Sequence, residues 1–364
     1  MTYVTQEEAT AISPRIGNTT SGNTSAKTKS THASQAEGDI ITVTGLSRKF
    51  DVSKPWLNRV IEREEKKYLK AVTDVSFTIR RKETLALVGE SGSGKSTVAK
   101  MVVGLLPPSS GEVIVDGQNI WGGGDLGPLR RRIQMIFQDP YASLNPRWRV
   151  DSIISDPIRA FGLAKDNAEI EQRVGDLLRL VGLDPLDGRK YPHEFSGGQR
   201  QRICIARALS SKPEFLVCDE PTSALDVSVQ AQILNLMRDL QDQFGLTYLF
   251  ISHNLAVVRH MATRIGVMYL GRIVEIAPSA ELFKAPRHPY TRMLLDAVPD
   301  LAMSGRPRKM IEGEIPNPIS PPTGCAFHPR CPLAFDRCKA EVPRPTNPNS
   351  DRSVACHAVE QGKI

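Results

Sequence analysis

The stretch that decides the fold is Gly89-Glu90-Ser91-Gly92-Ser93-Gly94-Lys95-Ser96-Thr97, which fits the phosphate-binding pattern G-x-x-x-x-G-K-[ST] at every position. Residues 84–88 before it form an apolar run with the length of a buried parallel strand. Residues 98–106 after it are typical of an apolar helix. The order of strand, loop and helix is the setting that this motif requires, so we expect a phosphate-binding site here.

Four residues of the loop have separate expected roles. Gly92 and Gly94 allow the chain to turn with its N–H groups pointing inward, so that the backbone and the start of the helix surround the phosphates. We expect Lys95 to reach the β- and γ-phosphates of a nucleotide, and the Ser96 hydroxyl to bind Mg²⁺. The loop therefore predicts ATP and Mg²⁺ as ligands.

Length and composition limit the class of protein. The 364 residues are enough for one large core and a smaller appended domain. No run approaches the roughly 18–20 consecutive apolar residues that span a bilayer, and residues 1–8 lack the apolar segment of a secretory signal. We therefore expect a reducing cytoplasmic setting, in which the six cysteines are not a disulfide framework. The formal charge of +7 fits membrane docking, nucleotide binding and nucleic-acid binding equally.

The chain before the loop divides into a tail and a pair of strands. Residues 1–38 are rich in Ser, Thr, Asn, Ala and Gly, and we expect a disordered tail. Residues 40–43 and 72–79 are typical of strands. The charged segment 52–67 between them is expected to be a solvated loop or a short helix.

An adenine ring needs an aromatic side chain to stack on, and two candidates lie upstream of the loop. They are Phe50 and Tyr68, one on each side of the charged segment. Because that segment obscures the spacing, the sequence leaves both open, and either ring is equally explained as part of the core.

Downstream of the loop the pattern alternates between strands and helices. Residues 111–115 and 133–138 are typical of strands, and the second ends in Gln138. Residues 140–209 then change to a helical composition, with apolar positions at helical spacing from 168 to 181. We expect a helical insert in an α/β core.

The insert closes with Phe195-Ser196-Gly197-Gly198-Gln199, which leads into the helical segment 202–209. Ser196 is a good helix N-cap, and the glycines beside it allow an anion to approach the helix N-terminus closely. This makes a second candidate phosphate site. Because one γ-phosphate cannot need two distant helix N-termini of one small core, we expect a dimer in which Ser196 and Gly198 face the nucleotide held by Lys95 of the other subunit.

Two further predicted strands are followed by side chains that can take part in catalysis or bind a metal ion. The apolar run 215–218 ends in Asp219 and Glu220, where ligands of open α/β sheets bind. We expect Asp219 to hold Mg²⁺ and Glu220 to orient or deprotonate the attacking water. His253 follows the apolar strand 247–252 and is expected to position that water at the γ-phosphate.

Together, these segments resemble the ATP-binding subunit of an ABC transporter over residues 39–285. Phe195 stands where the signature motif usually has Leu, a change confined to the apolar residue that precedes Ser196. The matching segments, in chain order, resemble a Walker A loop (89–97), a Q-loop (Gln138), a signature motif (195–199), a Walker B motif (215–220), a D-loop (223–226, ending in Asp226) and an H-loop (His253).

The resemblance implies an α/β fold, namely a P-loop NTPase of the ABC ATPase type with a helical subdomain at about 140–209 and an antiparallel β portion. It implies catalysis by Glu220 and His253, with Gln138 contributing to catalysis and to the Mg²⁺ site, and nucleotide contacts from residues 196–199 and Asp226. It also implies a second, non-identical ABC ATPase subunit, membrane permease subunits and, indirectly, a periplasmic or extracellular solute-binding protein. The expected location is peripheral, on the cytoplasmic face of the cell membrane.

Residues 286–364 change character and contain His288-Pro289-Tyr290, a proline-rich stretch and a cysteine-bearing segment. This part resembles the C-terminal extension of ATPases in the oligopeptide/dipeptide importer family, which also includes relatives that import nickel and glutathione. The resemblance implies import of di- or oligopeptides, with nickel, glutathione or another small solute as the alternative.

Four of the six cysteines lie close together in this extension, at positions 325, 331, 338 and 356. Four thiolates are the ligand set for a tetrahedral Zn²⁺ or for an iron–sulfur cluster. The gaps between Cys325, Cys331, Cys338 and Cys356 are wider than those usual for structural zinc, which favours a 4Fe-4S cluster over Zn²⁺. Four reduced thiols without a metal are the third interpretation.

ABC-type ATPase cores also occur in soluble proteins that repair DNA, organise chromosomes or act in translation. Such proteins usually carry long coiled coils, zinc modules or two tandem cores, whereas this chain has one core and no sustained heptad pattern. It also lacks a basic stretch interleaved with aromatic residues. We therefore expect no nucleic-acid partner.

Overall fold

A computed structural model describes residues 38–62, 65–297, 313–346 and 351–364. The expected tail, residues 1–38, thus lies outside the described residues except for Gly38. The described residues belong to one compact unit that extends to the C-terminus.

The strand before the phosphate loop, β3 (Thr84–Val88), is buried along its whole length in a seven-stranded sheet. Five strands of this sheet are parallel, in the order β9-β3-β8-β7-β6, and β10 and β11 extend it in antiparallel fashion beyond β9. The other six strands are β6 (Ile133–Ile136), β7 (Phe215–Asp219), β8 (Thr247–Ile251), β9 (Arg264–Tyr269), β10 (Arg272–Pro278) and β11 (Ser353–Val354).

Both faces of this sheet are covered, which explains why its strands are continuous apolar runs. Leu85 and Leu87 of β3 point into one hydrophobic core, and Ala86 and Val88 into another. The first core includes α2 (Lys95–Val102), which begins and ends earlier than the helix expected at 98–106. The second includes α8 (Val227–Phe244) and α9 (Leu255–Met261).

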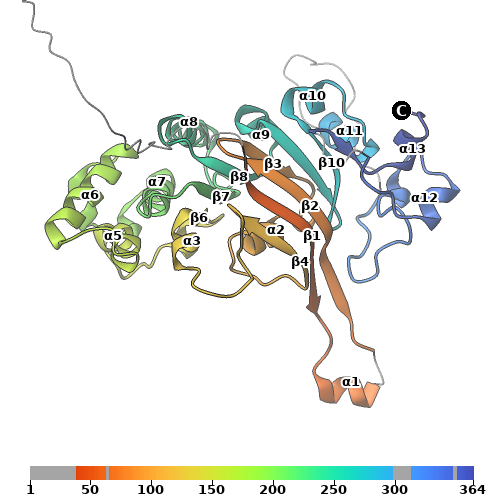
Figure 1. The fold of residues 1–364 in the computed structure, drawn as a ribbon, viewed down its shortest axis with the longest axis horizontal. Helices are drawn as coiled ribbons and strands as arrows, with labels where there is room; N and C mark the ends of the chain where they lie inside the picture. The colour runs from red at the N-terminus through yellow and green to blue at the C-terminus, as the bar shows by residue number, and fades with distance from the viewer. Residues whose placement is uncertain (1–37, 63–64, 298–312, 347–350) are drawn as a thin grey trace, which may run out of the picture. The chain divides into compact units, whose positions relative to one another are not determined.

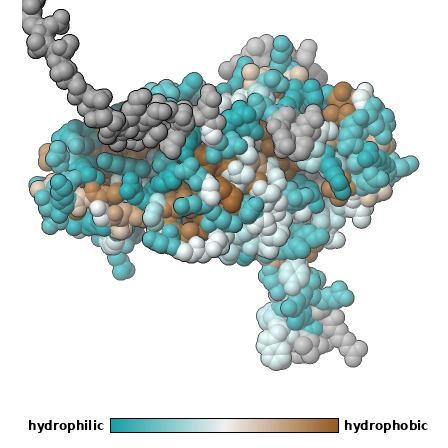
Figure 2. Space-filling model, in the orientation of Figure 1, coloured by the Kyte–Doolittle hydropathy of each residue, from teal (hydrophilic) through white to brown (hydrophobic). Residues whose placement is uncertain are grey.

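A second, four-stranded antiparallel sheet has the order β2-β1-β4-β5. Its strands are β1 (Asp39–Asp51), β2 (Tyr68–Arg80), β4 (Ser110–Val115) and β5 (Gln118–Asn119). Beyond the sheet, β1 and β2 continue as a long hairpin that carries α1 (Trp56–Glu62) at its tip (Figure 1). The coloured residues of this tip are mostly hydrophilic on the face in Figure 2.

The helical insert consists of α4 (Pro140–Ser143), α5 (Val150–Ala160), α6 (Asn167–Leu180) and α7 (Gly197–Leu209), with two 3₁₀ turns before α7. The buried positions of α6, Ile170, Val174 and Leu178, follow the helical spacing seen in the sequence. The insert was therefore correctly predicted as helical. A short helix, α3 (Gly127–Arg132), leads into β6.

The C-terminal extension packs against the main core. Its described elements are α10 (Ser279–Lys284), α11 (Pro289–Asp296), the 3₁₀ turn η4 (His328–Arg330), α12 (Asp336–Ala340), β11 and α13 (His357–Glu360). Tyr290 and Phe327 are fully buried within the same hydrophobic cluster as β3 and β7. Within the described part of the chain, no helix combines the length and apolar character needed to cross a bilayer.

Candidate nucleotide-binding site

The predicted site residues meet at one edge of the seven-stranded sheet. The strands β3, β8 and β7 are parallel neighbours, so their carboxyl ends share that edge. The loop 89–94 follows β3, Asp219 ends β7 and His253 follows β8. The topology thus brings the loop together with side chains that are more than 120 positions away in the sequence.

Two glycines fix the path of the loop by their close contacts with neighbouring backbone. A Cβ atom on Gly89 would lie 2.2 Å from the carbonyl oxygen of Met268. A Cβ atom on Gly94, whose φ is +102°, would lie 2.3 Å from the carbonyl oxygen of Ala71. Gly92 also has a positive φ of +78°, but a Cβ there would meet no atom within 4 Å. Glycine is therefore required at 89 and 94 for space, and at 92 for conformation alone.

Lys95 folds back onto the loop that precedes it. Its Nζ donates to the carbonyl oxygens of Gly89 at 2.8 Å and Glu90 at 2.9 Å, and lies 3.3 Å from Ser93 Oγ. Burial lowers the pKa of Lys95, and nearby carboxylates only partly offset this effect. A phosphate group in the loop would give the buried ammonium a charged partner, which a neutral carbonyl does not.

Ser96 and Asp219 form the candidate Mg²⁺ site. Ser96 Oγ donates to Asp219 Oδ1 at 2.9 Å. Asp219 is 5% exposed, and burial raises its pKa despite the Ser96 hydrogen bond. Hydroxyl and carboxylate oxygens are the ligands that Mg²⁺ prefers, and a cation would compensate the buried carboxylate. These two residues therefore fit the metal.

Glu220 is held between two other predicted site residues. Its Oε2 accepts a hydrogen bond from Gln138 Nε2 at 3.1 Å, and its Oε1 lies 3.1 Å from His253 Nδ1. Its φ is +47°, in the left-handed region that is uncommon for a residue with a side chain. The Glu220 N–H donates to the Ile251 carbonyl at 3.0 Å, which ties this bend to β8. Gln138 was also expected to contribute to the Mg²⁺ site. In the structure its amide nitrogen instead donates a hydrogen bond to Glu220.

Two family models match the chain. One describes the ABC transporter and matches residues 72–223, and the other describes the oligopeptide/dipeptide transporter C-terminal region and matches residues 274–338. A peptide import ATP-binding protein of Brucella abortus (strain 2308) is 51% identical over 91% of this chain and 98% of its own length. The chain belongs to the ABC transporter ATP-binding proteins.

Other members of the family are also similar. The di/tripeptide transport ATP-binding protein DppF of Pseudomonas aeruginosa (strain UCBPP-PA14) is 47% identical over 88% of this chain and 98% of its own length. Among solved structures, the dimeric post-hydrolysis state of the ATP-binding cassette MJ0796, bound to ADP and Pi, has a TM-score of 0.57 at 26% identity. It covers 66% of this chain and 98% of its own chain. The chain is an ABC ATPase with the predicted P-loop NTPase fold.

The signature motif of this ABC ATPase begins α7. Ser196 Oγ accepts from the Gln199 N–H at 3.3 Å, and Gln199 Oε1 accepts from the Ser196 N–H at 3.0 Å, which forms a capping box. A Cβ on Gly198 would lie 2.4 Å from Val229 Cγ1, and one on Gly197 would lie 3.4 Å from Leu225 Cδ2. The glycines thus bring α7 close to the start of α8.

Asp226 of the D-loop caps α8. Its Oδ1 accepts from the Val229 N–H at 2.9 Å and from Ser228 Oγ at 2.8 Å, and these bonds lower the pKa of Asp226. In the described ranges, no hydrogen bond or ion pair joins Asp226 or residues 196–199 to the Walker A loop. Their contact with nucleotide remains a prediction, as does the dimer on which it depends.

The two candidate adenine platforms lie on adjacent strands. Phe50 on β1 pairs with Leu69, and Tyr68 on β2 pairs with Asp51. The guanidinium of Arg48 lies 4.9 Å from the Phe50 ring centroid, and Tyr68 is exposed. Neither ring makes a hydrogen bond or ring contact with residues 89–97 among the described interactions, so the choice between them stays open.

Sequence reasoning missed that Glu90 of the Walker A loop contacts the C-terminal extension. The Glu90 N–H donates to Tyr290 Oη at 2.9 Å, and Arg330 forms a two-pronged ion pair with the Glu90 carboxylate at 2.9 and 3.0 Å. The His-Pro-Tyr segment was visible in the sequence, but nothing in it indicated a partner 200 residues away. The Glu90 side chain is thus engaged by the extension, and the expected contact of Glu90 with nucleotide stays a prediction.

The four cysteines of the extension lie near one another. The Cys325 N–H donates to the Cys338 carbonyl at 2.8 Å, and burial raises the pKa of the Cys325 thiol to about 11. However, the described residues contain no group of three or more His, Cys, Asp and Glu side chains placed to hold a metal ion. The expected 4Fe-4S cluster or Zn²⁺ thus finds no support in this geometry. Cys204 and Cys218 are buried in the main core, as expected.

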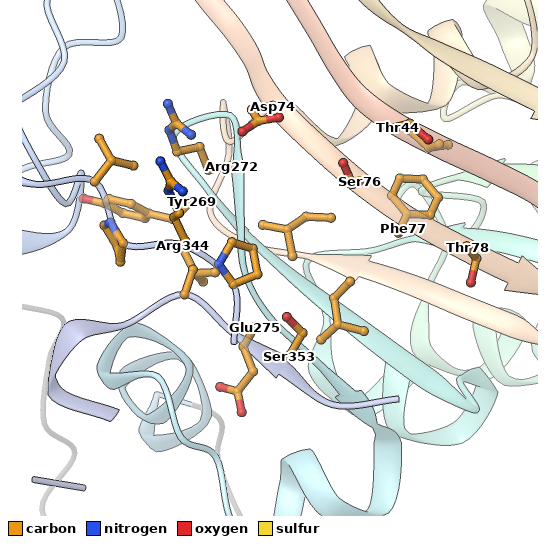
Figure 3. Close-up of a pocket in the computed structure, with 18 of the residues that line it drawn as sticks. Thr44, Asp74, Ser76, Phe77, Thr78, Tyr269, Arg272, Glu275, Arg344 and Ser353 are labelled. Atoms are coloured by element: carbon orange, nitrogen blue, oxygen red, sulfur yellow. The ribbon is translucent and has the colours of Figure 1, made fainter. Parts of the chain in front are cut away.

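One cavity of the described residues lies apart from the nucleotide site. It has a volume of about 1610 Å³ and lies between the four-stranded sheet, β9–β10 and the extension. Thr44, Ser76 and Thr78 line one side, and Arg272 and Arg344 lie on the other (Figure 3). Its lining includes none of the Walker A, Walker B or H-loop residues.

Proposed function

We propose that this ABC ATPase couples ATP hydrolysis to the import of di- or oligopeptides through a separate membrane permease. The observation that carries the proposal is the Glu220 carboxylate, held by Gln138 and His253 next to the Ser96–Asp219 pair. The peptide cargo is supported by the match to the oligopeptide/dipeptide transporter C-terminal region and by the relatives named for peptide transport.

Binding of ATP relies on the loop and the helix that follows it. The N–H groups of the loop and the N-terminal end of α2 attract the phosphates, and Lys95 exchanges its bonds to the Gly89 and Glu90 carbonyls for bonds to phosphate oxygens. Ser96 and Asp219 would hold Mg²⁺, which supplies charge neutralisation on the phosphates when bound.

Hydrolysis relies on Glu220. Its carboxylate orients a water molecule for attack on the γ-phosphate and accepts a proton from it. His253 and Gln138 position the carboxylate from two sides. Hydrolysis removes the γ-phosphate that bridges two ATPase subunits, and the subunits then separate.

The proposal requires partners. A second ABC ATPase, which we propose to be a non-identical chain, would place its signature serine against the nucleotide held by Lys95. Ser196 would in turn contact the nucleotide held by that second subunit.

Tyr141 and Trp148 are exposed on the helical insert shortly after Gln138 and offer an apolar surface to permease subunits. We place the complex on the cytoplasmic face of the membrane, fed by a solute-binding protein outside. The division into an ATPase domain, residues 39–285, and an extension, residues 286–364, stays a prediction.

Uptake measurements test this function. In cells whose only copy of the protein is Glu220→Gln, we expect uptake of a labelled di- or tripeptide to fall at least about tenfold, because turnover is lost while the fold is kept. Nickel and glutathione uptake are measured in parallel. If only the uptake of nickel or glutathione falls, that solute and not a peptide is the cargo. Unchanged uptake of all three at normal expression would refute the importer, and absence from the membrane fraction would favour a soluble ATPase.

The extension carries a second proposal, a 4Fe-4S cluster bound by Cys325, Cys331, Cys338 and Cys356, with Zn²⁺ as the alternative. It rests on the residue types and on their closeness in the sequence alone, because the described geometry places no three of these side chains to hold a metal ion. Iron, sulfide and zinc are measured in full-length protein purified without oxygen. Cys338→Ser should lower the metal content, whereas the control Cys204→Ser, in the main core, should not. Wild-type protein without iron or zinc would overturn the proposal.

A further inference from the structure

Glu90 is the one acidic residue of the Walker A sequence, and all of its polar groups have partners. Its N–H donates to Tyr290 Oη, its carbonyl accepts from Lys95 Nζ, and its carboxylate pairs with Arg330. The first and last of these partners belong to the C-terminal extension. Glu90 therefore connects the extension with the lysine that is expected to contact phosphate.

Tyr290 is held rigidly in the position from which it contacts the loop. It is fully buried, and its ring centroid lies 4.6 Å from that of Tyr269 and 5.4 Å from that of Phe327. The Tyr290 N–H donates to His288 Nδ1 at 3.0 Å, so His288 caps α11. Burial lowers the pKa of His288 to about 3, which keeps the imidazole neutral and able to accept this bond.

His288 is itself anchored to the main sheet. Its N–H and that of Arg287 donate to the carboxylate of Glu275, a fully buried residue of β10. The His-Pro-Tyr segment is thus hydrogen-bonded to β10 through His288 and to the Walker A backbone through Tyr290.

Arg330 is equally constrained. Its side chain is 3% exposed, and Nη1 also donates to Tyr269 Oη at 3.3 Å. Both prongs of the guanidinium engage the Glu90 carboxylate, a geometry that fixes orientation as well as charge. Arg330 ends the 3₁₀ turn η4 and directly precedes Cys331.

The charge of Glu90 gives this contact a consequence for nucleotide binding. A carboxylate in a phosphate-binding loop repels a polyphosphate, and the repulsion is large where both groups are partly buried. The Glu90 side chain is 18% exposed. Arg330 neutralises it and holds it on the side of the extension.

We propose that the C-terminal extension forms part of the nucleotide site, with Arg330 and Tyr290 as positioning residues that set the Walker A loop through Glu90. The extension thereby controls nucleotide affinity. This inference rests on the proposed function, because it assumes that the loop binds nucleotide.

The test is a double-mutant cycle on the full-length chain, with affinity for MgADP measured by calorimetry because ADP is not hydrolysed further. Arg330→Gln should weaken binding about 10- to 100-fold, since it leaves Glu90 charged and unpaired beside the phosphates. Glu90→Gln should weaken binding by less than about threefold, and the double variant should recover most of the loss. Tyr290→Phe should weaken binding about two- to tenfold.

The matched control is Arg337→Gln, which removes another arginine of the extension whose partners, Glu341 and Glu360, lie away from the loop. Its affinity should stay within about twofold of wild type. Losses that simply add in the double variant, or wild-type affinity in Arg330→Gln, would overturn the inference. If Arg330→Gln does not fold, the near-isosteric variant Tyr290→Phe provides the test instead. Wild-type affinity of Tyr290→Phe for MgADP would then overturn the inference. Failure of the wild-type chain to bind MgADP would instead refute the proposed function.

Discussion

Glu220→Gln is expected to lower the rate of ATP hydrolysis about 10²- to 10³-fold while ATP affinity changes by less than about threefold. The amide has the shape of the carboxylate and can still bond to Gln138 and His253, which contact Glu220 at 3.1 Å each. It cannot accept a proton from the attacking water. Phosphate release and ATP binding, measured on the same preparation, check the two halves of this expectation.

The control for this variant is Glu171→Gln, which makes the same chemical change at an exposed position of α6. We expect wild-type hydrolysis from it. A Glu220→Gln protein that hydrolyses ATP at the wild-type rate would remove Glu220 from the mechanism. A parallel loss of ATP binding and hydrolysis would show that the carboxylate supports the loop and not the reaction.

Gly94→Ala should lower ATP affinity by at least about 100-fold, because the loop cannot keep its path. The new Cβ would lie 2.3 Å from the Ala71 carbonyl oxygen, at a φ of +102°. Either β2 or the loop has to move, and Gly94 is the residue immediately before α2 and Lys95. ATP binding and urea-induced unfolding of the nucleotide-free chain measure this effect.

Gly92→Ala is the matched control for the unfolding measurement, because it introduces the same methyl group at a positive φ with no atom within 4 Å. Gly92→Ala should lower the free energy of unfolding only by the strain of the left-handed conformation, about 1–2 kcal/mol. Gly94→Ala should be less stable than Gly92→Ala. Equal stabilities would mean that the close contact with Ala71 does not constrain the loop.

The sequence by itself determined the fold class, the strand, loop and helix around residues 89–97, and the family. The pattern at residues 89–97 is local, so it predicts a phosphate-binding loop without information from the rest of the chain. The strands around it are continuous apolar runs because both faces of the parallel sheet are covered, and such runs are readable in sequence. The carboxylates at the end of β7 and the histidine after β8 could be assigned to one edge because parallel strands end together.

The tertiary structure alone decided how those residues are held. The left-handed φ of Glu220, which aims its carboxylate at Gln138 and His253, depends on a bond to Ile251 in a neighbouring strand. The metal site expected from the cysteine spacing is likewise a matter of side-chain geometry, and the described residues do not form one. Most of all, the contact of Tyr290 and Arg330 with Glu90 joins residues 200 and 240 positions apart. No sequence period or local spacing encodes such a contact, because it exists only once the extension has folded against the core.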